Sequence, residues 1–214
     1  MPLGPEFVGA WARRSIAIDD GPPSEPARVL WLQAGDAFAD LRVPLAPGRP
    51  ANSFDGVDAF AGVTTYDAPA LTWHHTIDWR GTFAGYDCGV VEHDGNTLIE
   101  RGEFRGDDGA HTYVEVWERV DDGAEGLVLT TDDAVAVRAG SYFLALHDRR
   151  TSGGRFGVRH AQLVDDAWTD VDVLGDGAQL PDATSAVRAA RSGLPAVDLA
   201  GRTWHVAERW CAQR

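Results

Sequence analysis

The sequence contains no lysine: all 19 basic residues are arginine, and 33 acidic residues set the net charge at −14. Without lysine, neither a Schiff-base enzyme nor a Walker A nucleotide site is possible. The excess of negative charge repels phosphate backbones, and no basic run in the chain offsets it. We therefore expect no nucleic-acid partner.

Long apolar runs are also missing, since none approaches the ~20 residues that a membrane span requires. The first residues show no basic start followed by an apolar segment, so no secretory signal is visible. The sequence thus favours a cytoplasmic protein with no membrane partner. Its two cysteines, Cys88 and Cys211, lie far apart and form no zinc-binding spacing with histidine, so we expect no disulfide framework and no metal site.

Several catalytic motifs are absent. No serine lies in a G-x-S-x-G context, which excludes the nucleophile elbow of α/β-hydrolases. No G-x-G-x-x-G follows a strand into a helix, which excludes a Rossmann dinucleotide site. The glycine-rich stretch 151–157 has the composition of a hairpin turn rather than of a phosphate loop.

The chain is rich in short stretches of Val, Thr, Trp and Tyr, separated by Gly, Asp and Pro, which is typical of strands and turns. The sequence HDGN at 93–96 predicts a hairpin, because Asp-Gly is a preferred two-residue turn. The predicted strands are 11–18, 27–33, 38–43, 70–79, 86–93, 97–104, 111–120, 126–131, 134–138, 141–147, 155–164, 167–174 and 202–210.

Few segments predict helix. Residues 53–62 fit one short helical turn capped by Ser53, and 182–193 fits a helix that Gly193 stops. A dozen short strands with so little helix indicate an all-β fold, an antiparallel sandwich or barrel. No low-complexity linker divides the chain, so we expect one domain over 1–214, with 44–56 as its longest irregular loop.

A short internal similarity raises the possibility of duplication. Trp-x-Arg followed by Asp-Asp-Gly begins at Trp11 and again at Trp117, almost half the chain later. Self-similarity at a fixed period would indicate two related halves that close one barrel. The match is short, and common residues dominate it.

Several stretches in order resemble a known family: GAWARRSI, then VLWLQAGDAFADLRVP, FAG and LTWHHTIDW, and later LIERGEF and YVEVWERV. The chain is similar over residues 7–120 to the lipocalin-like Hri1 family, which has yeast and bacterial members. The resemblance implies a lipocalin-related β-barrel whose interior holds a small apolar molecule. It implies no established catalytic residues.

The segment ALTWHHTIDW at 70–79 places a histidine on an apolar strand face. If side chains alternate, Leu71, Trp73, His75, Ile77 and Trp79 point inward and Asp78 points outward. An imidazole on that face orients a ligand in a hollow barrel, or is satisfied by neighbours in a packed one. A haem ligand is a further alternative, but no second ligand has a recognisable spacing, so no cofactor is predicted.

Three more residues carry polar groups on predicted inner faces. Glu115 shares a face with Tyr113 and Trp117, and as a buried carboxylate it requires a partner. Arg42 is a candidate partner, either to orient a ligand or to join the barrel wall. Gln33 shares a face with Trp31 and suits either ligand recognition or a core network. Glu100 and Glu103 flank Gly102, which indicates a β-bulge.

These residues support three hypotheses. The first is a carrier or sensor that binds a small, largely apolar molecule, with the candidate site Trp31, Gln33, Arg42, Trp73, His75, Tyr113, Glu115 and Trp117. The second is a cyclase, isomerase or dehydratase in the same barrel, with His75 or Glu115 as general acid or base. The third is a packed barrel that acts on another protein through its surface. The sequence does not predict an oligomeric state.

Overall fold

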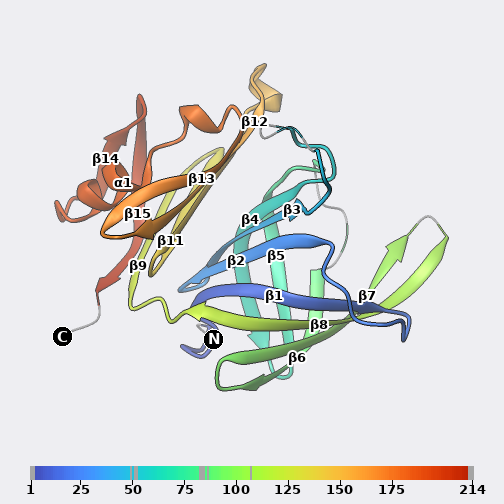
Figure 1. The fold of residues 1–214 in the computed structure, drawn as a ribbon. Coiled ribbons are helices and arrows are strands. Elements are labelled where there is room, and N and C mark those ends of the chain that lie inside the picture. The colour runs from blue at the N-terminus through green and yellow to red at the C-terminus, as the bar shows by residue number, and fades with distance from the viewer. Residues whose placement is uncertain are drawn as a thin grey trace.

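The computed structural model describes residues 3–48, 50, 53–81, 85, 87–106 and 108–211, with backbone only for Trp210 and Cys211. Its architecture is all-β, with a closed antiparallel barrel in the first half of the chain and a seven-stranded antiparallel sheet in the second (Figure 1). The predicted all-β barrel fold is confirmed. Cys88 is a free thiol, and the Cys211 side chain lies outside the described residues.

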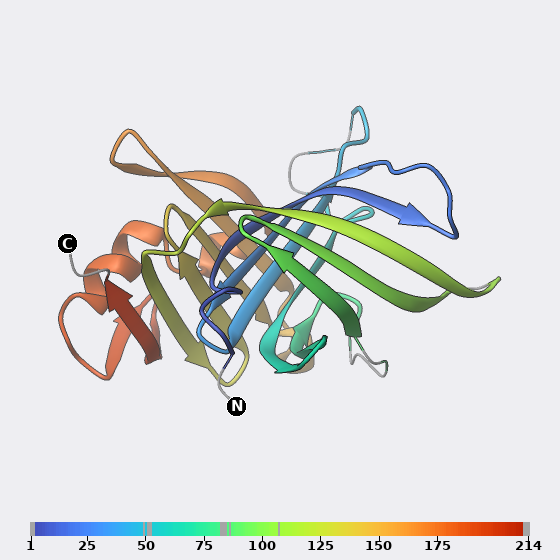
Figure 2. The same cartoon turned by 90° about the horizontal axis from the view of Figure 1, so that it is seen from below.

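The barrel is an eight-stranded meander in which each strand pairs with the next and β8 returns to β1. In Figure 2, the β7–β8 hairpin and the β1–β2 connection extend beyond the other strands at one end of the barrel. The strands are β1 (Gly9–Ile18), β2 (Ala27–Ala34), β3 (Ala37–Pro44), β4 (Asp58–Asp67), β5 (Ala70–Asp78), β6 (Asp87–Asp94), β7 (Thr97–Gly106) and β8 (Gly109–Asp121).

The second sheet has the order β13-β12-β11-β10-β9-β15-β14 and does not take part in barrel closure. The predicted helix at 182–193 is present as α1 (Ala183–Ala190), which Asp182 caps by accepting a hydrogen bond from the Ser185 amide at 2.8 Å. Two short 3-10 helices, Arg150–Ser152 and Gly177–Gln179, lie in connections. The strands are β9 (Glu125–Thr131), β10 (Ala134–Ala139), β11 (Tyr142–Asp148), β12 (Phe156–Val164), β13 (Ala167–Gly175), β14 (Ala196–Leu199) and β15 (Arg202–Cys211).

The two Trp-x-Arg segments lie side by side in the strands that close the barrel. Trp11 of β1 is in register with Arg119 of β8, and Arg13 with Trp117. The Arg119 guanidinium stacks over the Trp11 ring at 4.6 Å. The expectation that two similar halves close one barrel is therefore corrected, because the first half closes it alone and the second half forms an open sheet.

The two sheets share one hydrophobic core. Strands β2 and β3 are buried on both faces. The side chains of Leu30, Leu32 and Leu41 point out of the barrel and pack against Val137 and Leu144 of the second sheet. This double burial explains the nearly continuous apolar run in the sequence of β2. The opposite face of the second sheet, which includes the buried indole of Trp204 in β15, packs on α1.

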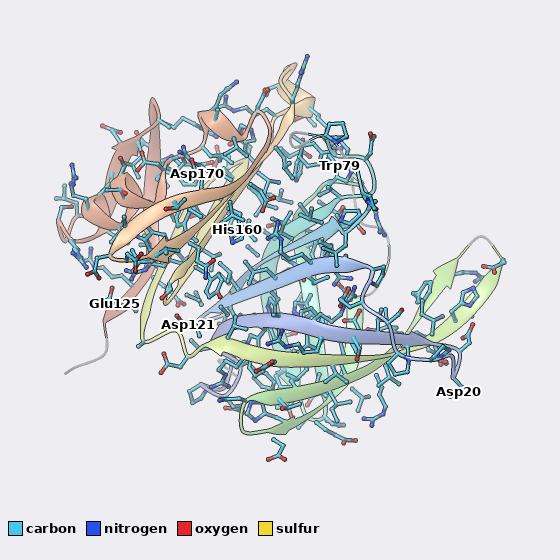
Figure 3. The ribbon with its side chains drawn as sticks, in the orientation of Figure 1. Asp20, Trp79, Asp121, Glu125, His160 and Asp170 are labelled. Atoms are coloured by element: carbon cyan, nitrogen blue, oxygen red, sulfur yellow. The ribbon has the colours of Figure 1, made fainter. Side chains whose placement is uncertain are left out.

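Polar contacts also join the sheets. Arg28 of β2 donates to Asp172 Oδ2 at 2.6 Å, and His160 Nδ1 lies 3.0 Å from the same oxygen, between the two layers in Figure 3. Arg150 donates to the carbonyls of Asp78 and Trp79 at 2.7 and 2.6 Å. These hydrogen bonds and ion pairs add to the apolar contacts that hold the two sheets together.

Two strands differ from the sequence prediction. Residues 58–67 form β4 rather than part of a helical turn, because the Ser53 hydroxyl accepts from the Asp55 amide at 3.0 Å and forms a local turn that ends before the strand. Small residues such as Ala59 and Ala61 hide the strand character of β4. The short strand β14 was also not predicted.

The predicted bulge at Gly102 is wrong. The β7–β8 ladder runs without a register shift, and Gly102 is paired directly with Tyr113. A Cβ atom at Gly102 would lie 2.4–2.7 Å from the Tyr113 ring and hydroxyl, so the glycine makes room for the tyrosine that lies across it. Glycine at this position therefore serves a close approach inside the barrel.

Candidate functional site

The barrel interior is divided into a filled end and a hollow end. At the filled end, the N-terminal residues Leu3 and Phe7 enter the aromatic core, and the Trp11 indole donates to the Phe7 carbonyl at 2.8 Å. At the other end lies a cavity of about 680 Å³, whose rim includes Ile18 and Phe104. This volume lies within the usual range for small-molecule sites, ~300–1,000 Å³.

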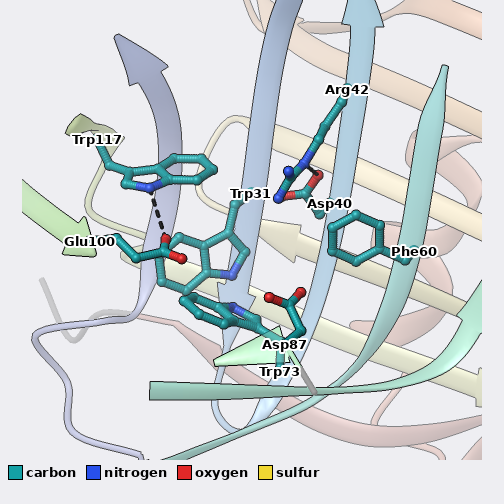
Figure 4. A pocket seen from close by; sticks show the side chains of 8 residues that line it. All are labelled: Trp31, Asp40, Arg42, Phe60, Trp73, Asp87, Glu100 and Trp117. Carbon is teal, nitrogen blue, oxygen red and sulfur yellow. Dashed lines mark hydrogen bonds and ion pairs between the residues drawn. The ribbon is translucent and has the colours of Figure 1, made fainter. Parts of the chain in front are cut away.

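A cluster of tryptophan side chains lies beside this cavity and lines a small void that adjoins it. Trp31 is the centre of the cluster, with ring centroids 5.6 Å from Trp73 and 5.8 Å from both Trp11 and Trp117. All four indoles are buried. Trp31, Trp73 and Trp117 therefore point into the barrel as predicted, and they border a void of about 10 Å³ that adjoins the cavity (Figure 4).

Gln33 belongs to the filled end. Its carbonyl accepts from Trp31 Nε1 at 3.1 Å and from the Thr64 hydroxyl at 2.9 Å, and its amide nitrogen donates to the carbonyls of Gly35 and Ala37 at 2.8 and 3.1 Å. All four hydrogen-bonding positions of the side-chain amide are used. Gln33 fixes the Trp31 indole and leaves no group for a ligand.

His75 lies in the cavity wall between two carboxylates. Its Nδ1 is 2.7 Å from Asp78 Oδ2 and its Nε2 is 2.9 Å from Asp87 Oδ2, while its ring stacks on Phe60 with centroids 4.3 Å apart. Burial lowers the pKa of His75, but the two carboxylates outweigh it and raise the pKa to about 9. The imidazole is thus a cation at neutral pH, with both nitrogens engaged.

A β-bulge changes the face of β5 after His75. Gly62 pairs with His75 and Ala61 with Ile77, so Thr76 is the extra residue. Asp78 consequently enters the cavity, whereas Ile77 and Trp79 pack toward the second sheet. The predicted inward direction of Ile77 and Trp79 and the outward direction of Asp78 are therefore wrong, because simple alternation does not continue through a bulge.

Two glutamates face each other inside the barrel. Glu100 of β7 and Glu115 of β8 are directly opposite in the ladder, and both are buried. Tyr113 donates to Glu100 Oε1 at 2.6 Å, and Trp117 Nε1 donates to Glu100 Oε2 at 3.1 Å. Burial and the neighbouring Glu115 raise the pKa of Glu100 to about 8, so its carboxyl group is mostly neutral at pH 7.

The partner of Glu115 is Arg13, not Arg42. Arg13 Nη1 is hydrogen-bonded to Glu115 Oε1, and its Nε donates to Glu25 Oε2 at 2.8 Å. Arg42 instead donates from Nε to Asp40 Oδ1 at 3.0 Å on its own strand. The predicted pairing of Arg42 with Glu115 is wrong because β1, which carries Arg13, is the strand adjacent to β8.

The cavity wall is more polar than the sequence led us to expect. Of the predicted site residues, Arg42, His75, Tyr113 and Glu115 line the cavity, whereas Trp31, Trp73 and Trp117 line only the adjoining void. Further ionisable residues join them: Asp58, Asp78, Arg80, Asp87, Glu100, Glu103 and Arg105.

Sequence reasoning missed Asp87, Asp78 and Phe60 as site residues and took Glu100 for part of a bulge. Phe60 lies in the strand that was not predicted, and Asp78 enters through the β5 bulge. Glu100 carried a usable signal, because it lies on the same face of 97–104 as the buried Leu98. Asp87, at the start of β6, carried none.

No helix in the described part of the chain combines the length and apolarity needed to cross a membrane. Among the described residues, no three histidine, cysteine, aspartate or glutamate side chains are grouped to hold a metal ion.

Comparison with known proteins gives one finding. The model of the family described as Protein HRI1 matches residues 10–208, which is most of the chain and includes both sheets. No curated protein and no solved structure matches. The lipocalin-like character of the family stays a prediction, supported by the closed eight-stranded meander. On the strength of this match, the chain belongs to the HRI1 family.

Proposed function

We propose that this protein binds a small molecule in the open end of its barrel, as a carrier or sensor. The observation that carries the proposal is the cavity of about 680 Å³, which is lined by fixed polar groups and adjoins a small void lined by the buried tryptophan cluster. Ligand sites typically combine concave apolar walls with a few placed polar groups. The ligand is small and has an apolar body, which packs against the aromatic side chains, and a polar group that meets the ionisable wall.

The net charge of −14 argues against a nucleic-acid partner, because it repels the phosphate backbone. A hollow barrel end gives less support to a protein that acts only through its outer surface, because that role requires no cavity.

A pair of equally exposed positions provides a test of the binding function. Ile18 lies at the cavity rim and is 43 % exposed, and Val63 on the outside of β4 is 45 % exposed. Replacing Ile18 by Trp narrows the entrance, whereas replacing Val63 by Trp adds the same bulk elsewhere. A panel of small molecules is screened by thermal shift on the unmodified protein, and the dissociation constants of those that bind are measured by calorimetry.

We expect Ile18→Trp to weaken binding at least tenfold and Val63→Trp to leave it unchanged. Equal affinities in both variants would place the binding site outside the barrel and refute the proposal. Failure of every compound in a broad panel to bind would refute it as well.

A second candidate is acid–base catalysis in the same cavity. It is favoured by the contrast between Glu100, whose pKa is raised to about 8, and Glu115, which is ion-paired to Arg13. Two carboxyl groups in such different environments are a recurrent acid and base pair. Glu100 would donate a proton and Glu115 would accept one. His75 is unsuited to either role because both of its nitrogens are bonded to carboxylates.

Catalysis and binding are separated by Glu100→Gln. If the protein converts a ligand of the cavity, this variant binds that ligand but loses turnover, and the rate of the unmodified protein falls as pH rises through 8. Turnover that persists in Glu100→Gln would remove Glu100 from the mechanism. Binding without any conversion by the unmodified protein supports the carrier or sensor role.

A further inference from the structure

The floor of the cavity ends in a small void of about 10 Å³. It shares Arg42, Phe60, Asp87 and Glu100 with the larger cavity, so the two spaces are continuous. A void of this size holds roughly one water molecule or one group of similar size. It is therefore a place for the head of a ligand whose body occupies the cavity above.

Three carboxyl groups, those of Asp40, Asp87 and Glu100, border this void. Asp87 uses one oxygen for His75, and its other oxygen has no hydrogen bond within the described residues. In Figure 4 the carboxyl groups of Asp87 and Glu100 lie near the Trp31 indole, while the Arg42 guanidinium lies against Asp40. The Asp87 carboxylate and the carboxyl oxygens of Glu100, together with indole faces, are surroundings that favour an organic cation.

The buried charges leave an excess of negative charge near the void. Arg13 between Glu25 and Glu115 leaves one negative charge uncompensated.

The second ion group, His75 between Asp78 and Asp87, leaves one more. The Arg42–Asp40 pair is neutral. One excess negative charge therefore lies in the cavity wall, in the His75 group, and a second lies in the Arg13 group, of which only Glu115 lines the cavity. A cation is the ligand charge that compensates them.

Arg42 does not make this an anion site. Burial alone would lower the pKa of Arg42, but the carboxylates of Asp40 and Glu115 outweigh burial and raise it well above its ordinary value. An anion that approached this guanidinium would also approach these carboxylates and Asp87. The repulsion would offset the attraction by a single cation that is already paired.

Resting on the proposed function of ligand binding, we propose that the ligand carries a protonated amine, which occupies the void between Asp87, Glu100 and the Trp31 and Trp73 indoles. The apolar part of the ligand extends through the cavity toward Ile18 and Phe104. An ammonium group fits because it offers three donors and a full charge within the size of one water molecule.

Two matched sets of probes test the proposal at pH 7 and constant ionic strength: octylamine, octanol and octanoate, and 2-phenylethylamine, 2-phenylethanol and phenylacetate. Dissociation constants are measured by calorimetry. We expect the amine to bind at least tenfold more tightly than the alcohol in each set, and the carboxylate most weakly. An alcohol or carboxylate that binds as tightly as its amine overturns the inference but leaves ligand binding intact. If neither amine binds, the ammonium site is overturned, while the broad panel described above decides whether the protein binds small molecules at all.

Two charge-matched variants separate local contact from general attraction to an acidic protein. Asp87→Asn and Glu103→Gln each remove one charge, but Asp87 borders the void whereas Glu103 lies only at the outer cavity and is exposed. We expect Asp87→Asn to remove most of the tenfold preference for amines and Glu103→Gln to keep it. An equal effect of both variants would refute a local ammonium site.

A measurement on the unmodified protein tests the proposal even if the Asp87→Asn variant does not fold. Octylamine is titrated into protein labelled with nitrogen-15, and the indole N–H resonances are followed by NMR. We expect the Trp31 and Trp117 signals to shift and the Trp204 signal, from the second sheet, to stay fixed. A shift of Trp204 without shifts of the barrel indoles would overturn the proposal.

Discussion

Replacing Glu100 by Gln should make the protein more stable at alkaline pH. The Glu100 side chain is buried, with the residue 4 % exposed, and its pKa rises from 4.5 in the unfolded chain to about 8 in the folded protein because of burial and the neighbouring Glu115. The amide of Gln has a similar shape. It can accept from the Trp117 indole and donate to the Tyr113 hydroxyl, so both hydrogen bonds at this position have a replacement.

The sign of the effect follows from proton counts. Between pH 4.5 and 8 the unfolded chain has lost the Glu100 proton while the folded protein still holds it, so stability falls as pH rises. One proton of difference corresponds to roughly 1.4 kcal/mol per pH unit. Across the whole window, the carboxyl group costs on the order of 5 kcal/mol relative to a neutral group.

The assay is urea unfolding followed by far-UV circular dichroism at pH 5.5, 6.5 and 7.5. The free energy of unfolding of Glu100→Gln minus that of the unmodified protein should grow with each step of pH. Glu103→Gln, on an exposed position of the same strand, should show no such growth. A difference for Glu100→Gln that stays constant with pH would refute the raised pKa and, with it, the account of Glu100 as a neutral acid.

Three further predictions concern other parts of the structure. Arg13→Leu leaves the buried Glu115 carboxylate without its main partner and should lower the free energy of unfolding by ~3–5 kcal/mol, measured in urea; a loss below ~1 kcal/mol would contradict the buried ion pair. The unmodified protein should lose stability between pH 6.5 and 9, because the raised pKa of His75 stabilises the folded state below pH 6.5 and this contribution disappears as pH rises through 9. His75→Gln should not show this loss; the same loss in the variant would argue against the charged imidazole. Leu32→Ala should cost ~2–5 kcal/mol, since Leu32 is fully buried between barrel and sheet, whereas Val63→Ala on the exposed face should cost under ~0.5 kcal/mol; equal losses would contradict the shared core.

Strand prediction from the sequence succeeded where turn residues and β-branched residues mark short segments. Thirteen predicted strands and the helix at α1 are present within a few residues of their expected bounds. The strand β4 was missed because its alanines and Gly62 carry little strand preference, and its position is set by pairing with β3 and β5.

The candidate site was predicted in part. Alternation along strands placed Trp31, Trp73, Trp117 and Glu115 on inner faces, because the period of two is a local property of the backbone. Alternation failed after His75, where the bulge exchanged Asp78 for Ile77 inside the barrel. A bulge depends on the partner strand, so the sequence of β5 alone does not reveal it.

The sequence by itself determined an all-β chain, its strands, its acidic character and an aromatic barrel interior, since these follow from local composition and periodicity. Only the tertiary structure decided that strands β1 to β8 close the barrel alone, that Arg13 and not Arg42 pairs with Glu115, and that Glu100 faces Glu115 in a hollow end. Which charges become neighbours depends on strand order and register across long sequence separations, and no local pattern encodes it.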